Sequence, residues 1–237
     1  MRRRRFLSQC AVLGGAATLA PLAGLPAAWA QETPRLYTRT RLTDVHGRSL
    51  RAADLAPETN YVFQYPFTAT PCLLLKLARP VAVPAAAKRA EGAGPTWQGG
   101  VGRERDIVAF SAICAHKLAY PTREVSFIRY QREKSATSGA RVIHCCADHS
   151  VYDPADGARV LSGPAPQPLA GILLEHDAAG DGLYALGTVG PDQFEPFFDK
   201  YRMRLALEYG EARARNAVAG TSVVRELANY CRTTIQC

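Results

Sequence analysis

Short apolar runs separated by turn residues dominate the chain from Leu36 onwards. Runs rich in β-branched, aromatic and aliphatic residues predict strands at 36–42, 61–65, 72–77, 106–111 and 141–144. Two further runs, 171–176 and 183–189, flank the turn-rich segment 177–182 and predict a hairpin. The Pro-, Gly- and Ala-rich interval 80–102 predicts an irregular surface loop. Many short strands joined by turns predict a mostly β, antiparallel fold.

The last part of the chain, 192–237, follows a different pattern. Its aromatic and aliphatic residues recur at helical spacing, at Phe194, Phe197, Phe198, Tyr201 and Leu205. Asp192 is placed to cap this helix and Gly210 to end it. We expect the apolar stripe to pack on its own domain or, alternatively, on a partner subunit. A second helix is predicted at 221–230, so that 192–237 forms a C-terminal helical extension.

The first 30 residues have the pattern of an export signal rather than of folded structure. Arg3-Arg4-Arg5-Phe6-Leu7 matches the twin-arginine pattern, an apolar stretch follows, and Ala28-Trp29-Ala30 is a small-x-small cleavage site. We therefore expect a periplasmic protein. An ordinary secretory signal and an uncleaved leader that anchors the chain in a membrane are the alternatives.

Charge narrows the choice of partners only slightly. The formal net charge is +8, but four arginines lie in the leader, which leaves 29 − 4 = 25 basic against 21 acidic residues, or +4. Such a mild excess favours docking on an acidic redox partner and does not indicate a nucleic-acid ligand.

Two short Cys/His motifs carry the chemistry. Box 1 is Cys114-Ala115-His116, box 2 is Cys146-Ala147-Asp148-His149, and the 29 residues 117–145 separate them. Each box offers one thiolate and one imidazole and follows a predicted strand, so two strands can hold the two loops side by side. The segment Gly163-Pro164-Ala165-Pro166 predicts a stiff third loop that covers the site.

The boxes, Tyr152-Asp153 and the segment 163–169 together resemble the Rieske iron–sulfur proteins. Around Tyr65-Pro66 and 71–77 the chain is most similar to the small subunit of arsenite oxidase, and the resemblance covers roughly residues 35 to 190. It implies an antiparallel Rieske-type β-sandwich over 31–191, with a small cluster-binding subdomain at about 106–168.

The resemblance also implies one [2Fe–2S] cluster per subunit. Cys114 and Cys146 would bind one iron, and His116 and His149 would bind the other at an exposed tip. Hydrogen bonds to sulfur are expected from Ser150 and Tyr152.

The chain departs from the family pattern in box 2 and near box 1. Many relatives carry one further Cys in each box, and these two cysteines form a disulfide. Here the matching positions hold Ala119, or a near neighbour, and Asp148, and no Gly follows His149. A carboxylate at Asp148 favours the oxidised cluster, so we expect a reduction potential below that of the disulfide-braced relatives.

The other cysteines leave alternatives open. Cys145 with His149 is a Cys-x₃-His pair that does not match the family, so Cys146 is the preferred ligand, while His144 is interpreted as an ordinary strand residue. Disulfides are possible among Cys72, Cys145, Cys231 and Cys237. The local option is Cys231–Cys237.

These observations predict a periplasmic electron-transfer protein without a substrate-level catalytic site of its own. We expect it to serve as small subunit or partner of a larger oxidoreductase, or to exchange electrons with a cytochrome c-type partner. One alternative is the iron–sulfur subunit of a quinol–cytochrome c reductase that retains its leader in the membrane. Another is a zinc-stabilised interaction module, because two Cys and two His also satisfy tetrahedral zinc.

Overall fold

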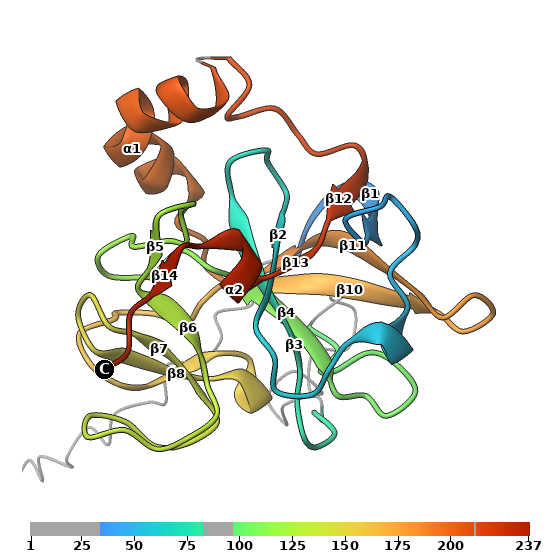
Figure 1. Ribbon diagram of the computed structural model, residues 1–237, viewed down its shortest axis with the longest axis horizontal. Coiled ribbons are helices and arrows are strands. Elements are labelled where there is room, and N and C mark those ends of the chain that lie inside the picture. The colour runs from blue at the N-terminus through green and yellow to red at the C-terminus, as the bar shows by residue number, and fades with distance from the viewer. Residues whose placement is uncertain (1–33, 83–96, 211) are drawn as a thin grey trace, which may run out of the picture.

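The computed structural model describes residues 34–82, 97–210 and 212–237 (Figure 1). The predicted signal at 1–30 and positions 83–96 of the predicted loop lie outside these residues. Among the described residues, the strands form an eight-stranded sheet (the large sheet), a four-stranded sheet (the small sheet) and a two-stranded pair.

The large sheet has the order β12-β1-β11-β10-β4-β3-β2-β13. All its neighbours are antiparallel except β1 and β12, which are parallel. Its strands are β1 (Arg35–Thr43), β2 (Tyr61–Gln64), β3 (Pro71–Lys76), β4 (Ile107–Ser111), β10 (Gly171–Asp177), β11 (Gly182–Val189), β12 (Gly220–Val223) and β13 (Arg225–Glu226). The mostly β, antiparallel fold class predicted from the sequence is confirmed.

Both faces of the large sheet are covered, which explains why β3 and β4 are continuous apolar runs. Successive side chains of a strand point to opposite faces. Leu73 and Phe110 accordingly belong to one hydrophobic core, whereas Leu74 and Ala109 belong to the other.

The small sheet lies against the first of these cores and carries box 2. Tyr130, Ile143 and Tyr152 of the small sheet share that core with Leu73 and Phe110 of the large sheet. Its order is β6 (Ile128–Gln131), β7 (Val142–Cys145), β8 (Ser150–Asp153) and β9 (Arg159–Ser162). The two-stranded pair is β5 (Val125–Ser126) with β14 (Thr233–Thr234), and one-turn 3-10 helices span Ala52–Asp54 and Pro154–Asp156.

Helix α1 (Phe194–Tyr209) packs on its own domain, as one of the two alternatives predicted. Its buried residues join a third core that includes Tyr120, whose ring centroid is 4.9 Å from that of Phe197. The Lys200 ammonium donates a hydrogen bond to the Lys117 carbonyl (2.6 Å), so α1 also contacts the loop of box 1. Gly210 ends the helix as expected, with its N–H bonded to the Ala206 carbonyl.

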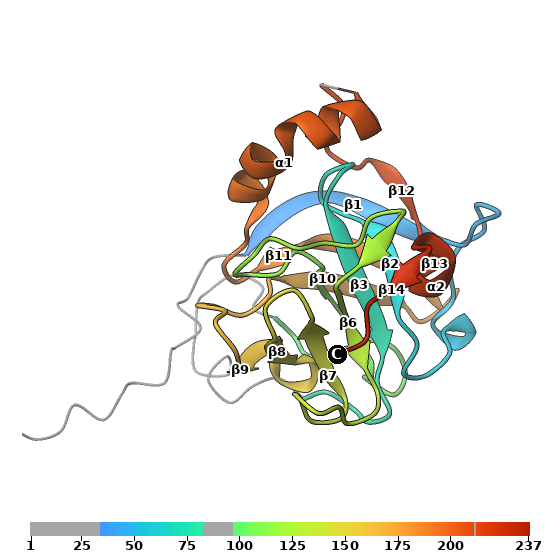
Figure 2. The same cartoon turned by 60° about the vertical axis from the view of Figure 1, so that its left-hand side comes forward.

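The predicted second helix at 221–230 is wrong. Only the turn α2 (Leu227–Tyr230) is helical there, because the preceding residues extend the large sheet as β12 beside β1 and β13 beside β2. After α2 the chain returns to the small sheet through β14, and both views place the C-terminus beside β6 and β7 (Figures 1 and 2). No helix among the described residues is both long and apolar enough to span a membrane.

Candidate metal centre

Box 1 forms a tight loop after β4 that turns one side chain inwards and another outwards. The Cys114 N–H donates to the Ala119 carbonyl (2.9 Å), and the Leu118 N–H donates to the Cys114 carbonyl (3.0 Å). Cys114 is fully buried in the core, whereas 36% of the His116 side chain is exposed. The loop therefore separates a buried thiol from an accessible imidazole.

Box 2 is the turn between β7 and β8. The His149 N–H donates to the Cys145 carbonyl (2.8 Å), and His149 has a φ of 59°, in the left-handed region that few non-glycine residues adopt. The predicted third loop lies against this turn, because a Cβ added to Gly163 would be 2.4 Å from the His149 carbonyl oxygen. Close packing of the two backbones thus holds the turn in place.

The thiols that meet in the core are those of Cys114 and Cys145. Their sulfur atoms and a carboxylate oxygen of Asp148 all lie within 4.8 Å of one another. The hydrogen bond from the Cys145 thiol, aided by the Tyr152 hydroxyl, lowers the pKa of Cys114 to about 7 despite burial. The same hydrogen bond and burial raise the pKa of Cys145. The pair therefore includes one thiol that is readily available as a thiolate ligand.

Asp148 links the two boxes. One of its carboxylate oxygens lies 2.9 Å from Nδ1 of His116 and 3.4 Å from Sγ of Cys114, and its other oxygen accepts a hydrogen bond from the Ser150 N–H (3.0 Å). Burial alone would raise the pKa of Asp148, but the hydrogen bonds from Ser150 and His116 outweigh it and lower the pKa. We call Cys114, Cys145, His116 and Asp148 the inner donor group.

Cys146, the predicted box 2 ligand, is not part of this group. Its sulfur is bonded to Cys237 in a disulfide, and therefore the structure does not bring it to Cys114. The reason is strand geometry: adjacent residues at the end of β7 point to opposite sides, and Cys145 takes the core side. The local option Cys231–Cys237 is not formed, because Cys237 pairs with Cys146 and Cys231 is a buried free thiol.

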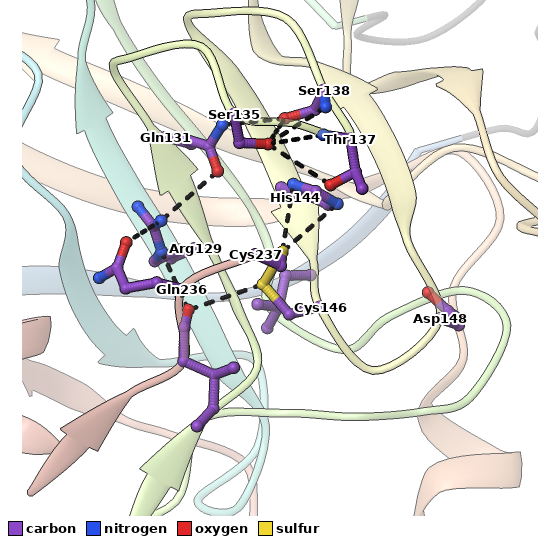
Figure 3. Close-up of a disulfide and its surroundings, with 12 residues drawn as sticks. Arg129, Gln131, Ser135, Thr137, Ser138, His144, Cys146, Asp148, Gln236 and Cys237 are labelled. Atoms are coloured by element: carbon purple, nitrogen blue, oxygen red, sulfur yellow. Dashed lines mark hydrogen bonds between the residues drawn. A yellow bond between two sulfur atoms is a disulfide. The ribbon is translucent and has the colours of Figure 1, made fainter.

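His149 lies in a separate cluster on the other side of the small sheet. One ring nitrogen of His149, one of His144 and the sulfur of Cys237 all lie within 4.8 Å of one another. His144 is fully buried, its ring contacts the Cys237 sulfur at 3.4 Å, and Figure 3 shows Asp148 apart from this disulfide. We call His144, His149 and Cys237 the outer donor group.

Tyr152 lies where a hydrogen bond to sulfur was expected. The Tyr152 hydroxyl is 3.5 Å from Sγ of Cys114 and accepts a hydrogen bond from the Ala115 N–H (3.2 Å). The Ser150 hydroxyl is buried without a hydrogen-bond partner in the described part of the chain. This hydroxyl nevertheless lies close enough to Asp148 to help lower the pKa of that carboxyl.

The predicted set of Cys114, His116, Cys146 and His149 does not converge, but the inner donor group does fit an iron–sulfur cluster. It offers two buried thiols and two non-sulfur donors, the partly exposed His116 imidazole and the buried Asp148 carboxylate. Sequence reasoning preferred Cys146 to Cys145, and it placed Asp148 near the cluster without making it a donor. The available signal was their spacing, because Cys145-x-x-Asp148 repeats the Cys-x-x-His pattern of box 2 one residue earlier.

No protein-family model matches the chain. Among solved structures the chain is similar to the soluble domain of Rieske protein II (soxF) from Sulfolobus acidocaldarius, with 28% sequence identity and a TM-score of 0.46. That likeness covers 64% of this chain and 78% of the other.

Proposed function

We propose that this protein is a Rieske-type electron-transfer protein that holds one [2Fe–2S] cluster in the inner donor group. The observation that carries the proposal is the pair of buried thiols, Cys114 and Cys145, beside the buried Asp148 carboxylate and the partly exposed His116 imidazole. Two thiolates on one iron and non-sulfur donors on the other are the asymmetry of a Rieske centre. A bound cluster would accept and release one electron at a time.

The surrounding residues have distinct tasks in this proposal. Cys114 and Cys145 bind the inner iron as thiolates, and the hydroxyls of Tyr152 and Ser150 direct hydrogen bonds at sulfur, which raises the potential. His116 binds on the solvent side, and its partly exposed ring provides the route for an electron to a docked partner.

The partner and the compartment are parts of the same proposal. The twin-arginine pattern at Arg3-Arg4-Arg5-Phe6-Leu7 supports export to the periplasm. The Cys146–Cys237 disulfide is in keeping with an oxidising compartment. The similarity around Tyr65-Pro66 supports a role as small subunit of an oxidoreductase of the arsenite-oxidase type. We expect the substrate chemistry to take place on the larger partner.

The optical spectrum of the exported protein, purified from its native periplasm, tests the proposal. We expect a coloured protein with two irons and two acid-labile sulfides per chain, whose absorbance bleaches on reduction and which then gives an EPR signal. A colourless protein that contains zinc, or no metal, would contradict it. Co-purification of a larger redox subunit tests the proposed partner separately.

A further inference from the structure

We infer that Asp148, rather than His149, is the fourth ligand of the centre, which gives a donor set of Cys114, Cys145, His116 and Asp148. This inference rests on the proposed function, because it specifies the ligands of the proposed cluster. It replaces an imidazole with a carboxylate on the solvent-side iron.

The position of the Asp148 side chain is the first argument. Only 3% of it is exposed, although it belongs to a surface turn. Its oxygens contact both the Cys114 sulfur (3.4 Å) and the His116 Nδ1 (2.9 Å). Within the described ranges no Lys or Arg pairs with it, and His116 is its one ion-pair partner. The negative charge of a buried carboxylate needs a nearby cation or metal ion to compensate it. A metal bound in the inner donor group would supply that positive charge.

The position of His149 is the second argument. Its ring lies beside that of His144, with 5.7 Å between the ring centroids, in a donor cluster that shares no member with Cys114, Cys145 and Asp148. The backbone is held from two sides, by the hydrogen bond to the Cys145 carbonyl (2.8 Å) and by the contact with Gly163. An exchange of Asp148 and His149 at the site would require the whole turn to be rebuilt.

The register of box 2 is the third argument. The structure places Cys145 in the core and ties Cys146 to Cys237. When the thiol ligand is Cys145, the residue that follows the two intervening positions is Asp148. The pair Cys145-x-x-Asp148 therefore keeps the spacing of Cys146-x-x-His149. Both members of the pair shift together by one residue.

A carboxylate ligand changes the chemistry of the centre in a definite direction. It adds a negative charge where a neutral imidazole would add none, so it favours the oxidised cluster and lowers the reduction potential. It also leaves a single imidazole, that of His116, bound to iron. The number of iron-bound imidazole nitrogens therefore distinguishes this donor set from the set with two histidines.

The test uses the exported full-length protein and hyperfine (pulsed EPR) spectroscopy of the reduced cluster. We expect one iron-bound imidazole nitrogen in the wild type and in His149→Ala, which should keep its full iron content. Asp148→Ala should lose about tenfold or more of its bound iron. Asp148→His should retain the cluster with two bound nitrogens and a higher potential. His46→Ala, at an exposed histidine in the turn after β1, is the matched control.

Two bound nitrogens in the wild type, or loss of the cluster in His149→Ala with retention in Asp148→Ala, would overturn the inference. Far-ultraviolet circular dichroism and an intact Cys146–Cys237 disulfide show that a variant has folded. The count of iron-bound nitrogens in the wild type tests the inference even if a variant fails to fold. A zinc protein that loses its zinc in Asp148→Ala but not in His149→Ala would overturn the proposed function and support the ligand assignment. A metal-free wild type would overturn both.

Discussion

The inner and outer donor groups are built from the same stretch of chain, but they have opposite surroundings. Cys145 and Asp148 lie beside Cys114, and the Asp148 carboxylate contacts both Cys114 and His116 of box 1. Their direct neighbours His144 and His149 lie on the other side of the small sheet, beside the disulfide. One group leaves two thiols free for a metal, whereas the other has used its sulfur in a covalent bond.

This difference shows that residue type does not decide which cysteine or histidine of box 2 lies beside Cys114. Cys145 and Cys146 are adjacent, yet one is a buried free thiol and the other is half of a disulfide. The difference comes from the direction in which each side chain points. Cys145 faces the core, whereas Cys146 faces the C-terminal segment and is bonded to Cys237. The predictions below test this division.

The largest effect on iron binding is expected from removing one of the two adjacent cysteines of box 2 but not from removing the other. Cys145→Ser should abolish iron binding, because it removes an inner thiol. The double variant Cys146→Ser/Cys237→Ser should bind iron at the wild-type stoichiometry, because it changes only the outer side. Iron and sulfide analysis of the purified proteins checks both. Loss of iron in the double variant alone would restore Cys146 as the ligand.

The same double variant should be less stable than the wild type. The disulfide joins residues separated by 91 positions, and closing so long a loop stabilises a fold by about 2–4 kcal/mol. Chemical denaturation under non-reducing conditions measures the loss. Cys231→Ala, which removes a buried free thiol, is the control and should cost about 1 kcal/mol. Equal losses in the two proteins would show that the tail is not held by this bond.

Gly163→Ala tests whether the third loop holds the turn that separates the two groups. Gly163 has a φ of 90°, and its new Cβ would lie 2.4 Å from the His149 carbonyl oxygen. We expect a destabilisation of about 2–3 kcal/mol from the strained φ and the clash together. Gly139→Ala, where nothing lies within 4 Å of the added Cβ, should change stability by less than about 1 kcal/mol. Denaturant titration of both variants decides.

The smallest effect is expected at a polar contact that uses neither metal nor disulfide. The Glu58 carboxylate, 12% exposed, accepts hydrogen bonds from the Tyr130 hydroxyl and the Arg141 guanidinium, both at 2.9 Å. It thereby joins the segment before β2 to the small sheet. Glu58→Gln should lower the free energy of unfolding by about 1–2 kcal/mol at pH 7, because it weakens the hydrogen bonds to a charged acceptor. The loss stays small because Arg141 is largely exposed and its charge is screened by solvent.

This contribution should depend on pH. Burial alone would raise the pKa of Glu58, but Tyr130 and Arg141 outweigh it and lower the pKa below its ordinary value of 4.5. The stabilisation is therefore present above pH 4.5 and is lost as the pH falls through the folded-state pKa. The gap between wild type and Glu58→Gln in denaturant titrations should close in that range. A gap that stays constant down to pH 3 would contradict the assignment.

Much of the fold followed from local pattern. The predicted strands at 36–42, 61–65 and 72–77 and the hairpin at 171–189 correspond to β1, β2, β3 and β10–β11. The stripe of α1 was visible because a helix with one buried face shows a period near 3.6. Segments whose pairing depends on distant strands were missed, above all β12, β13 and β14.

By itself, the sequence determined the mostly β architecture, the helix α1 and the neighbourhood of the site, because strand and helix periodicity and paired Cys/His boxes are local properties. It did not determine which neighbour in box 2 faces the core. A shift of one residue turns every side chain of a strand to the other face, and the register of β7 depends on its pairing with β6 and β8. The return of the C-terminus to the small sheet then joined Cys237 to Cys146. Tertiary packing alone therefore placed Cys145 and Asp148 beside Cys114.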